Sequence, residues 1–406
     1  MVSGSPTITT ANFGRLCQQL PSFSPDEFVL VTGGLGYIGS HAALELMKAG
    51  YNVIIIDDLS NSFSSVRWRI QQLAAAHCRA EGRPIPQLRF HEADYQSPAM
   101  KVILEQYATP SYDGGDHPRS QIAAVIHFAA YKSVPLSILH PLDYYENNVC
   151  GLVRFVRLLG SFHIHTFIFS SSATVYGSKA NTEKPLREED VVHHSHDPNR
   201  PASVEGLACP YARTKYFCEA ILADVAASDP RWRIVVLRYF NPIGCDPSGV
   251  LGESPRATPT NLFPVVGQVL TGQRDQLSVF GRDWPTRDGT AIRDYVHVAD
   301  IARGHVKALE KENTRGEPFR VYNLGSGTGS SVLEVVRSLE AATGTEIPIV
   351  WTGRRPGDVG FCVAANARAE KELDWTPIVG IGQSAKDLWN YLLLQQQERT
   401  LPAAAT

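Results

Sequence analysis

Residues 28–39 read Phe28-Val29-Leu30-Val31-Thr32-Gly33-Gly34-Leu35-Gly36-Tyr37-Ile38-Gly39, and this stretch decides the fold. Its first four residues form a short apolar run that is typical of a buried strand. The glycines that follow allow a tight turn and let backbone N–H groups approach a pyrophosphate at the start of a helix. The helix is indicated by apolar residues on one side, Ile38, Ala42, Leu46 and Ala49. Strand, glycine turn and helix in this order predict a dinucleotide-binding unit, with a purely structural turn as the alternative.

Further apolar runs follow along the chain at 53–56, 88–93, 124–128, 167–170 and 234–237. Helical patterns lie between the later runs, as where Val149, Leu152, Val153 and Val156 recur with helical spacing. Strands that are apolar throughout and alternate with helices imply a parallel sheet covered on both faces. The sequence therefore predicts an α/β fold, a Rossmann-type doubly wound parallel sheet.

The character of the chain changes near residue 240, where turns, Pro and Gly become frequent. Helical patterns then recur, one of them opened by the capping box Ser331-x-x-Glu334. We predict a smaller mixed α/β substrate-binding domain at 241–395, with some chain crossing back. It follows the dinucleotide-binding domain at 27–240, and the flanking parts are an N-terminal extension (1–26) and a C-terminal tail (396–406). The stretches 109–121 and 188–208 are expected to be surface insertions.

Composition excludes several classes of function. The net charge of −3 carries no bias toward polyanions, so no nucleic acid is expected as a partner. The seven cysteines are scattered and form no Cys-x-x-Cys motif, which argues against a metal site and a disulfide framework and favours a reducing, cytoplasmic setting. No signal peptide and no run long enough to span a membrane is evident, so no membrane association is expected.

Two further motifs carry chemistry. Asp57 ends the second apolar run, where a carboxylate accepts hydrogen bonds from a ribose; with Asp58 it would repel a 2′-phosphate, so NAD is favoured over NADP. Tyr211-x-x-x-Lys215 places a phenol and an ammonium one helical turn apart. A free Tyr has a pKa of roughly 10, and a nearby cation lowers it, so the pair can form a general base. The alternative is an ordinary solvated helix face.

Other candidates are weaker. Ser172 ends the strand run 167–170 and could share the proton that Tyr211 takes, although Ser-rich strand ends are usually turns. His127 is expected to be a packing residue, and the run 324–329 a turn leading into the capped helix. Arg293 and Arg355 could clamp a diphosphate or be surface arginines. His193, His194 and His196 lie in a polar insertion and are expected to be solvated, so no metal is predicted.

With these motifs in order, the chain resembles the extended short-chain dehydrogenases/reductases, and more narrowly the UDP-glucose (UDP-galactose) 4-epimerase family. The resemblance runs from about Phe28 to Trp375. It is carried by the glycine turn through His41 and by the segments 125–130, 144–149, 169–177, 210–215, 237–242, 288–298 and 322–325.

The resemblance implies roles for residues of both halves. The catalytic residues would be Tyr211, Ser172 and Lys215. The NAD-binding set would add Gly33, Gly36, Tyr37, Ile38, Gly39, Asp57, Asp58, Leu59, Asn61, Ser62, Asp94, Tyr95, Phe128, Ala129, Ala130, Lys132, Asn147, Tyr239 and Phe240. The UDP-sugar would be bound by Lys132, Ser172, Thr174, Tyr211, Asn241, Asn261, Leu262, Ser278, Val279, Phe280, Arg293, Arg355, Asp358 and Cys362.

The implied reaction is reversible epimerisation at C4 of UDP-glucose and UDP-galactose. Hydride would pass to NAD while Tyr211 takes the hydroxyl proton and Ser172 relays it, and the 4-keto sugar would turn before hydride returns. The resemblance implies that the position of Cys362 is a Tyr in family members restricted to unmodified hexoses and a smaller residue in those that also accept N-acetylated sugars. The small Cys362 therefore predicts activity on UDP-GlcNAc and UDP-GalNAc as well, unless it is only a buried apolar residue.

Three alternatives remain beside this activity. A 4,6-dehydratase would carry an Asp-Glu pair after Ser172, where this chain has Ala173 and Thr174. A UDP-glucuronate 4-epimerase would need an additional cation, and an NAD-sensing regulator could dispense with the Tyr/Lys pair. The family also implies a homodimer formed through the helices around 144–159 and 211–225. The second insertion lies between Ser172 and Tyr211, so the geometry of that pair depends on its looping out.

Overall fold

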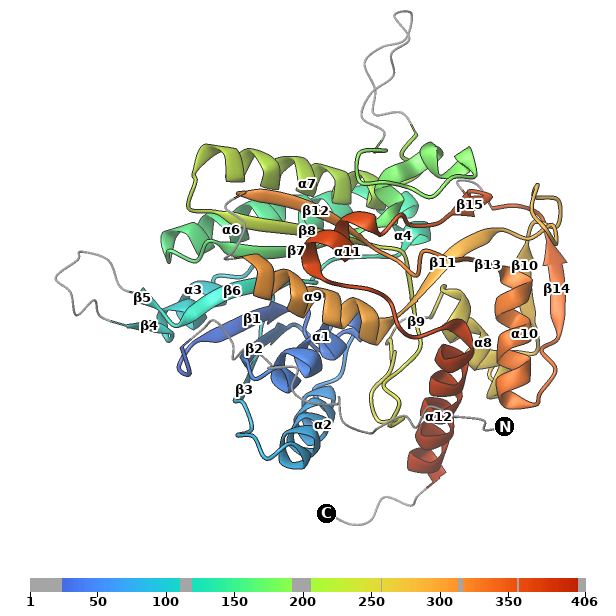
Figure 1. The fold of residues 1–406 in the computed structure, drawn as a ribbon, viewed down its shortest axis with the longest axis horizontal. Helices are drawn as coiled ribbons and strands as arrows, with labels where there is room; N and C mark the ends of the chain where they lie inside the picture. The colour runs from blue at the N-terminus through green and yellow to red at the C-terminus, as the bar shows by residue number, and fades with distance from the viewer. Residues whose placement is uncertain are drawn as a thin grey trace, which may run out of the picture.

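The computed structural model describes residues 24–109, 119–191, 206–256, 258–312, 317–355 and 358–400. Seven parallel strands form its main sheet, in the order β12-β8-β7-β6-β1-β2-β3 (Figure 1). They are β1 (Phe28–Thr32), β2 (Asn52–Asp57), β3 (Leu88–Glu92), β6 (Ile122–His127), β7 (Thr166–Ser172), β8 (Arg233–Tyr239) and β12 (Phe319–Leu324). All the strands predicted from apolar runs lie in this sheet, so the predicted doubly wound α/β fold is confirmed.

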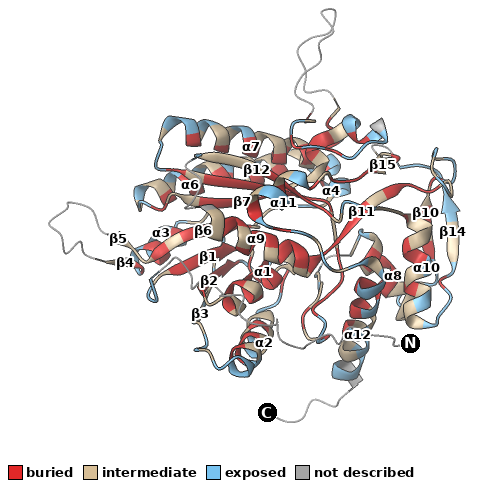
Figure 2. Ribbon diagram, in the orientation of Figure 1, coloured by how far each residue is buried: buried red, intermediate tan, exposed pale blue. Residues whose placement is uncertain are grey.

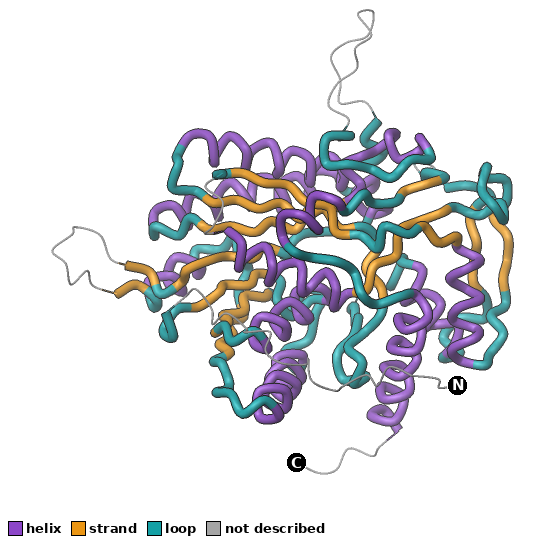
Figure 3. The backbone as a smooth tube through the Cα atoms, viewed as in Figure 1, coloured by secondary structure: helices purple, strands orange, loops and turns teal. Residues whose placement is uncertain are grey.

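Helices cover both faces of the sheet because successive strand residues point to opposite sides. Val29, Val31 and Ile55 face one layer of helices, and Leu30 and Ile54 face the other. The first layer contains α1 (Tyr37–Lys48), α2 (Val66–Ala80), α9 (Val298–Glu312) and α11 (Ala367–Leu373); the second contains α3 (Ala99–Glu105), α6 (Gly151–Ser161) and α7 (Pro210–Ser228). Figure 2 shows the strands between the two layers as mainly buried, and Figure 3 shows the same arrangement by element type.

The edges of the sheet differ from the expectation of uniformly apolar strands. β3 contains half-buried and exposed residues because, among the described strands, only β2 pairs with it. β12 forms the other edge, beside β8, and its residues 319–321 are only half-buried. The chain thus returns to the main sheet after residue 312, as the expected crossing back requires. The division into domains at residue 240 itself stays a prediction.

A second apolar core lies beyond the carboxyl ends of the central strands. It is built by α8 (Leu262–Leu270), α10 (Val332–Thr343), α12 (Ile381–Thr400), β10 (Leu277–Phe280) and β14 (Ile349–Thr352). A small sheet joins this core to the main one, with β11 (Ile292–His297) beside β13 (Gly329–Ser331) and β15 (Phe361–Cys362), and β9 (Asn241–Ile243) pairing with β11. The predicted capping box is confirmed: Ser331 and Glu334 bond each other's backbone at the start of α10.

Shorter elements lie at the carboxyl edge of the main sheet and at the insertions. After β6 come α4 (Val134–Leu139), α5 (Pro141–Tyr145) and a π-helical turn (Glu146–Cys150), and after β7 comes a 3₁₀ segment (Ala173–Thr182). The first insertion is bracketed by the antiparallel pair β4 (Ala108–Thr109) and β5 (Arg119–Ser120). The run 324–329 is the predicted turn, and its Ser326 and Gly327 N–H groups donate to the buried Asp294 carboxylate at 2.6 and 3.0 Å.

The second insertion is anchored in the protein at its start, which differs from a wholly surface loop. Glu188 is buried, and its carboxylate accepts a hydrogen bond from the Asn323 N–H at 2.9 Å. Val191 is also buried against Val175 and Tyr176. His193, His194 and His196 lie outside the described residues.

Candidate active site

The glycine turn is shaped for close backbone approach. Gly33 has φ +67°, and a Cβ atom there would lie 2.8 Å from the Ala129 backbone nitrogen. A Cβ atom at Gly39 would lie 2.2 Å from the Gly33 carbonyl oxygen. A larger residue at Gly33 would push the turn away from the neighbouring strand end, and one at Gly39 would clash within the turn, so the glycines are required where they stand.

The start of α1 fits an anion. Gly36 is the N-cap residue and gives no side-chain cap to the helix, and the first turn contains no acidic residue. The first backbone N–H groups of a helix lack partners within it, and the helix dipole favours negative charge at this end. Because the turn lies at the edge where the strand order reverses between β1 and β6, the residues present fit a dinucleotide pyrophosphate.

A single cleft runs from the glycine turn to α7 and gathers most of the predicted cofactor residues. It is lined by Gly33, Gly36, Tyr37, Ile38, Gly39, Asp57, Asp58, Asn61, Ser62, Asp94, Tyr95, Phe128, Ala129, Ala130, Lys132, Asn147, Tyr211, Lys215 and Tyr239. Three predicted cofactor residues do not line it: Leu59, Ser172 and Phe240. The Leu59 N–H instead donates to Asp57 at 3.0 Å, and Phe240 packs in an apolar cluster beside Tyr176.

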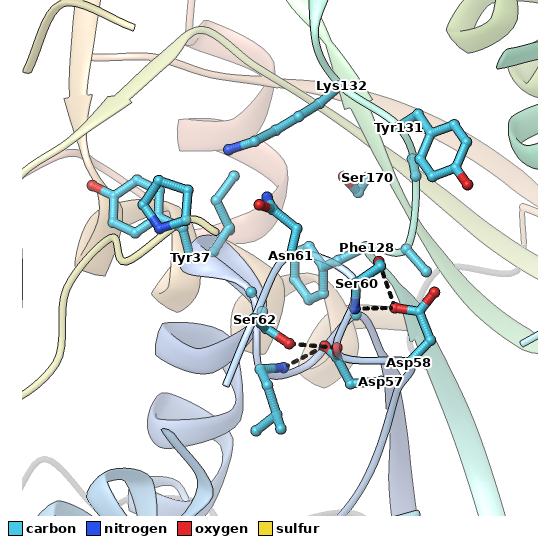
Figure 4. Close-up of a pocket in the computed structure, with 18 of the residues that line it drawn as sticks. Tyr37, Asp57, Asp58, Ser60, Asn61, Ser62, Phe128, Tyr131, Lys132 and Ser170 are labelled. Carbon is cyan, nitrogen blue, oxygen red and sulfur yellow. Dashed lines mark hydrogen bonds between the residues drawn. The ribbon is translucent and has the colours of Figure 1, made fainter. Parts of the chain in front are cut away.

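Asp57 and Asp58 stand together at one end of this cleft (Figure 4). The Asp57 carboxylate accepts hydrogen bonds from the Leu35 N–H at 2.9 Å and from the Ser62 hydroxyl at 2.6 Å. Asp58 accepts from the Ser60 N–H and hydroxyl. Backbone donors thus hold the Asp57 carboxylate in place, and the two negative charges favour ribose hydroxyls over a phosphate.

The cleft also contains residues that the sequence did not reveal. They are Leu35, Ile56, Ser60, Val66, Ala93, Tyr131, Ser170 and the segment 252–255. That segment comes from far along the chain, and Glu253 faces Lys132 across the cleft at 3.1 Å. Ser60 could have been found from its place in the run 57–62, but segment 252–255 has no motif that points to this position.

The predicted catalytic pair lies on α7, which begins with Pro210. Lys215 is buried, and its ammonium donates to the Ser170 carbonyl at 2.7 Å and lies 4.8 Å from the centre of the Phe169 ring. Burial lowers the pKa of Lys215 to about 8, although Cys218 and Glu219 act in the opposite direction. Burial raises the pKa of Tyr211, and a hydrogen bond with Ser172 only partly offsets this.

The expectation that Lys215 gives Tyr211 a lowered pKa is therefore wrong for the protein by itself. Burial is the largest cause of the raised pKa, because a buried phenolate loses its hydration. A phenolate here needs a further positive charge close to the ring. Tyr211 and Ser172 are nevertheless brought into hydrogen-bonding contact, so the intervening insertion does not separate them.

His127 is the packing residue that was predicted. Its Nδ1 and the Thr32 hydroxyl are 2.7 Å apart, and its ring is surrounded by Tyr95, Phe155 and Phe167. Burial lowers its pKa to about 3.

Some of the predicted substrate residues lie together near β11, and the others are spread over neighbouring elements. Arg355 bonds Asp358 at 3.0 Å and lies over the Phe280 ring at 4.4 Å, while Arg293 is 3.8 Å from Asp358. Arg293 is paired in register with Cys362. Asn241 opens β9, Asn261 and Leu262 open α8, and Ser278 and Val279 lie in β10, with Val279 fully buried. Thr174 hydrogen-bonds Ser172 at 3.1 Å. Of this set, Lys132 and Tyr211 line the cofactor cleft.

Two searches of the described chain bear on other functions. None of its helices is long and apolar enough to cross a membrane. In the same part of the chain, no three His, Cys, Asp or Glu side chains gather in a way that could hold a metal ion.

Comparisons with known proteins agree with this geometry. Residues 29–325 match the model of the family described as NAD dependent epimerase/dehydratase. The chain is 42% identical over 364 residues to UDP-glucose 4-epimerase 2 of Arabidopsis thaliana, which covers 89% of this chain and 94% of the relative.

Solved structures are similar over the same length. The UDP-glucose 4-epimerase of Bifidobacterium longum in complex with NAD⁺ and UDP is 38% identical, with a TM-score of 0.77, covering 91% of this chain and 99% of that one. The UDP-Glc/GlcNAc 4-epimerase of Campylobacter jejuni is 28% identical, with a TM-score of 0.68, covering 91% and 99%. The chain therefore belongs to the NAD dependent epimerase/dehydratase family, among the UDP-glucose 4-epimerases.

Proposed function

We propose that the protein interconverts UDP-glucose and UDP-galactose by epimerisation at C4, with NAD as its resident cofactor. The observation that carries this is that the acid–base pair Tyr211 and Lys215 lines the same cleft as the glycine turn and Asp57. The relatives named UDP-glucose 4-epimerase support this activity rather than the alternatives raised by the sequence.

NAD would be held along this cleft from Asp57 to Lys215. The glycine turn and the start of α1 would bind the pyrophosphate, Asp57 the adenosine ribose, and Lys215 the nicotinamide ribose. When bound, NAD accepts hydride from C4 and returns it, and its oxidised ring brings the positive charge that a Tyr211 phenolate requires.

Tyr211 would act as the general base and then as the general acid. It takes the proton of the sugar 4-hydroxyl as the C4–H bond breaks, and it returns that proton when hydride adds to the other face. Ser172 hydrogen-bonds Tyr211, so its hydroxyl can orient and relay this proton. The residues after Ser172 are Ala173 and Thr174, which supply no carboxyl group for elimination of water.

The nucleotide would be anchored by Arg293 and Arg355, so that the 4-keto sugar can turn without leaving. Both arginines contact Asp358, and Arg355 also covers the Phe280 ring. Guanidinium groups suit a diphosphate because they bind it through paired N–H donors. An aromatic ring next to them offers an apolar face for the base.

The same site would accept N-acetylated sugars. Cys362 is a small residue that is 9% exposed and packs beside Phe240 and Val175. The C. jejuni structure, named a UDP-Glc/GlcNAc 4-epimerase, gives limited support because it is only 28% identical. We therefore include UDP-GlcNAc and UDP-GalNAc as substrates in the proposal.

A homodimer through α6 and α7 completes the proposal. A hollow is lined by Val153, Val156, Arg157 and Gly160 of α6, by Ile221 and Val225 of α7, and by Trp232, which follows α7. The cytoplasmic location stays a prediction that rests on the scattered cysteines.

A coupled assay of the purified protein on UDP-galactose and UDP-GalNAc, side by side, tests the proposed activity. Turnover of both is expected. Turnover of UDP-galactose alone would contradict the N-acetyl assignment, and turnover of neither would contradict the function.

A further inference from the structure

A buried ion pair lies directly behind the acid–base centre. The Glu219 and Arg238 side chains are 7% and 6% exposed, and two Arg238 nitrogens reach the carboxylate at 2.6 and 3.0 Å. Arg238 also donates to the Tyr176 hydroxyl at 3.1 Å and to the Glu188 carbonyl at 2.7 Å. Burying two charges is costly, so such a pair is weak evidence for stability and raises the question of another role.

The pair reaches the reacting groups through three consecutive serines at the end of β7. The Ser170 carbonyl accepts the hydrogen bond of Lys215. The Ser171 hydroxyl donates to Glu219, and Ser172 bonds Tyr211. Glu219 therefore holds the middle serine, and with it the positions of the two neighbours that serve Lys215 and Tyr211. Arg238, on β8, holds Glu219 from the adjacent strand.

Glu219 also faces Lys215 as a charge. It lies one helical turn after Lys215, and it favours the ammonium form of Lys215. The other titratable groups around Lys215 are neutral near neutral pH: burial lowers the pKa of His127 to about 3, raises that of Cys218 to about 12, and raises those of Tyr211 and Tyr239. Within the described chain, the Glu219 carboxylate of this ion pair is thus the charged group that acts on Lys215 in favour of its ammonium form.

We propose that Glu219, fixed by Arg238, is a positioning residue of the reaction: it sets the strand-end serines and supplies the negative charge behind Lys215. This inference rests on the proposed epimerase function. It assigns these two residues a part in the chemistry although neither lines the cofactor cleft.

The test is the pH dependence of kcat for UDP-galactose, measured on the NAD-bound enzyme. In Glu219→Gln, Lys215 loses its proton at lower pH, so the alkaline limb of kcat moves down by about one pH unit while KM changes less than about twofold. Ser171→Ala is the matched control, since it removes the serine contact but keeps the charge. In Ser171→Ala, kcat is expected to fall about threefold while the alkaline limb of its pH profile stays at the wild-type pH.

A double variant distinguishes a role of the ion pair in the reaction from a role in stability alone. Glu219→Gln leaves Arg238 buried and unpaired, so it lowers the thermal unfolding midpoint; Glu219→Gln/Arg238→Met removes both charges and restores it. The inference predicts that the restored double variant keeps a downward shift of the limb, smaller than in Glu219→Gln because the Arg238 charge is also gone; of the two, Glu219 is the group that acts on Lys215. A double variant with the wild-type limb would overturn the inference while leaving the epimerase function intact. No turnover by the wild type would overturn both.

Discussion

At the scale of single residues, the proposal gives Cys362 the role of setting how much room the sugar has. Its side chain is nine-tenths covered, next to Phe240, and its strand is paired with the one that carries Arg293. Cys362→Tyr adds a ring in this position and leaves no space for a 2-acetamido group. We expect it to reduce turnover of UDP-GalNAc at least about a hundredfold and that of UDP-galactose less than about threefold. Cys362→Ser, which keeps the small volume, is the control. Equal loss of both activities in the tyrosine variant would refute the assignment.

Three buried histidines couple stability to pH. Burial lowers the pKa of His41 and of His305 to about 4, and that of His127 to about 3. The unfolded chain therefore binds more protons than the folded one below a pH of about 6.5, so stability is full above that pH and is lost as pH falls toward 4. At a pH of about 5, each histidine costs about 2 kcal/mol.

Chemical denaturation between pH 7 and pH 4 measures this effect. His305→Gln should flatten the dependence, because one of the three buried imidazoles is then missing. An unfolding free energy that stays constant over this range would contradict the burial of these rings as neutral groups.

The acid–base centre shows what could be predicted from residues and what could not. Asp57 ends a predicted strand, and Tyr211 and Lys215 lie one turn apart on a predicted helix. Their presence in one cleft was therefore predictable from the sequence. The raised pKa of Tyr211 did not, because it depends on how completely several distant segments bury the ring. The Glu219–Arg238 pair gave no sequence signal either, since its partners come from two different elements, α7 and β8, joined by a turn.

At the scale of elements, the segment 252–256 closes one side of the cofactor cleft. Glu253 faces Lys132 across the cleft, and the Arg256 side chain donates to the Ser62 carbonyl at 2.8 Å and lies over the Phe63 ring at 4.3 Å. These contacts join the segment 252–256 to Lys132 and to the loop that follows Asp57. Bound NAD would have to pass this segment to leave.

Arg256→Ala should therefore speed the release of NAD about tenfold, since it removes both the hydrogen bond and the ring contact. The rate is measured by exchange of bound NAD for a labelled nucleotide. Arg337→Ala, at an exposed position of α10, should leave the rate unchanged. If Arg256→Ala released NAD at the wild-type rate, the segment would have no part in retention.

Elements with a strong apolar pattern were predictable, and those shaped by their neighbours were not. Val53 to Ile56 are all apolar, which fits a strand with a neighbouring strand on each side, and β2 lies between β1 and β3. β12 reads Phe-Arg-Val-Tyr-Asn-Leu, a mixed pattern that fits only an edge beside β8. Glu188 is polar and lies in a charged stretch, so a surface position was expected. Its carboxylate is buried instead, where it accepts a hydrogen bond from the Asn323 N–H.

At the scale of the whole molecule, the chain leaves the main sheet after β8 and returns to it with α9 and β12. The chain therefore passes more than once between the main sheet and the second core. The paired strands β9 and β11 connect the two at the carboxyl edge of the sheet. The cofactor cleft takes residues from both parts of the chain, such as Asp57 and Glu253.

The proposed dimer is tested at the same scale. Val225→Asp places a charge in the apolar hollow of α6 and α7, and it should convert a dimer to a monomer in light scattering at micromolar concentration. Arg337→Ala serves again as the control. Dimers that persist in Val225→Asp would show that these helices do not form the contact.

The central claim is that Tyr211 moves the proton at C4 in a cleft that holds NAD. It is tested most directly by the turnover of UDP-galactose and the bound NAD content of Tyr211→Phe, measured on the same preparation. Removing one hydroxyl leaves the ring and the cleft in place, so we predict that NAD stays bound while turnover falls at least about a thousandfold. Turnover at the wild-type rate would contradict the mechanism.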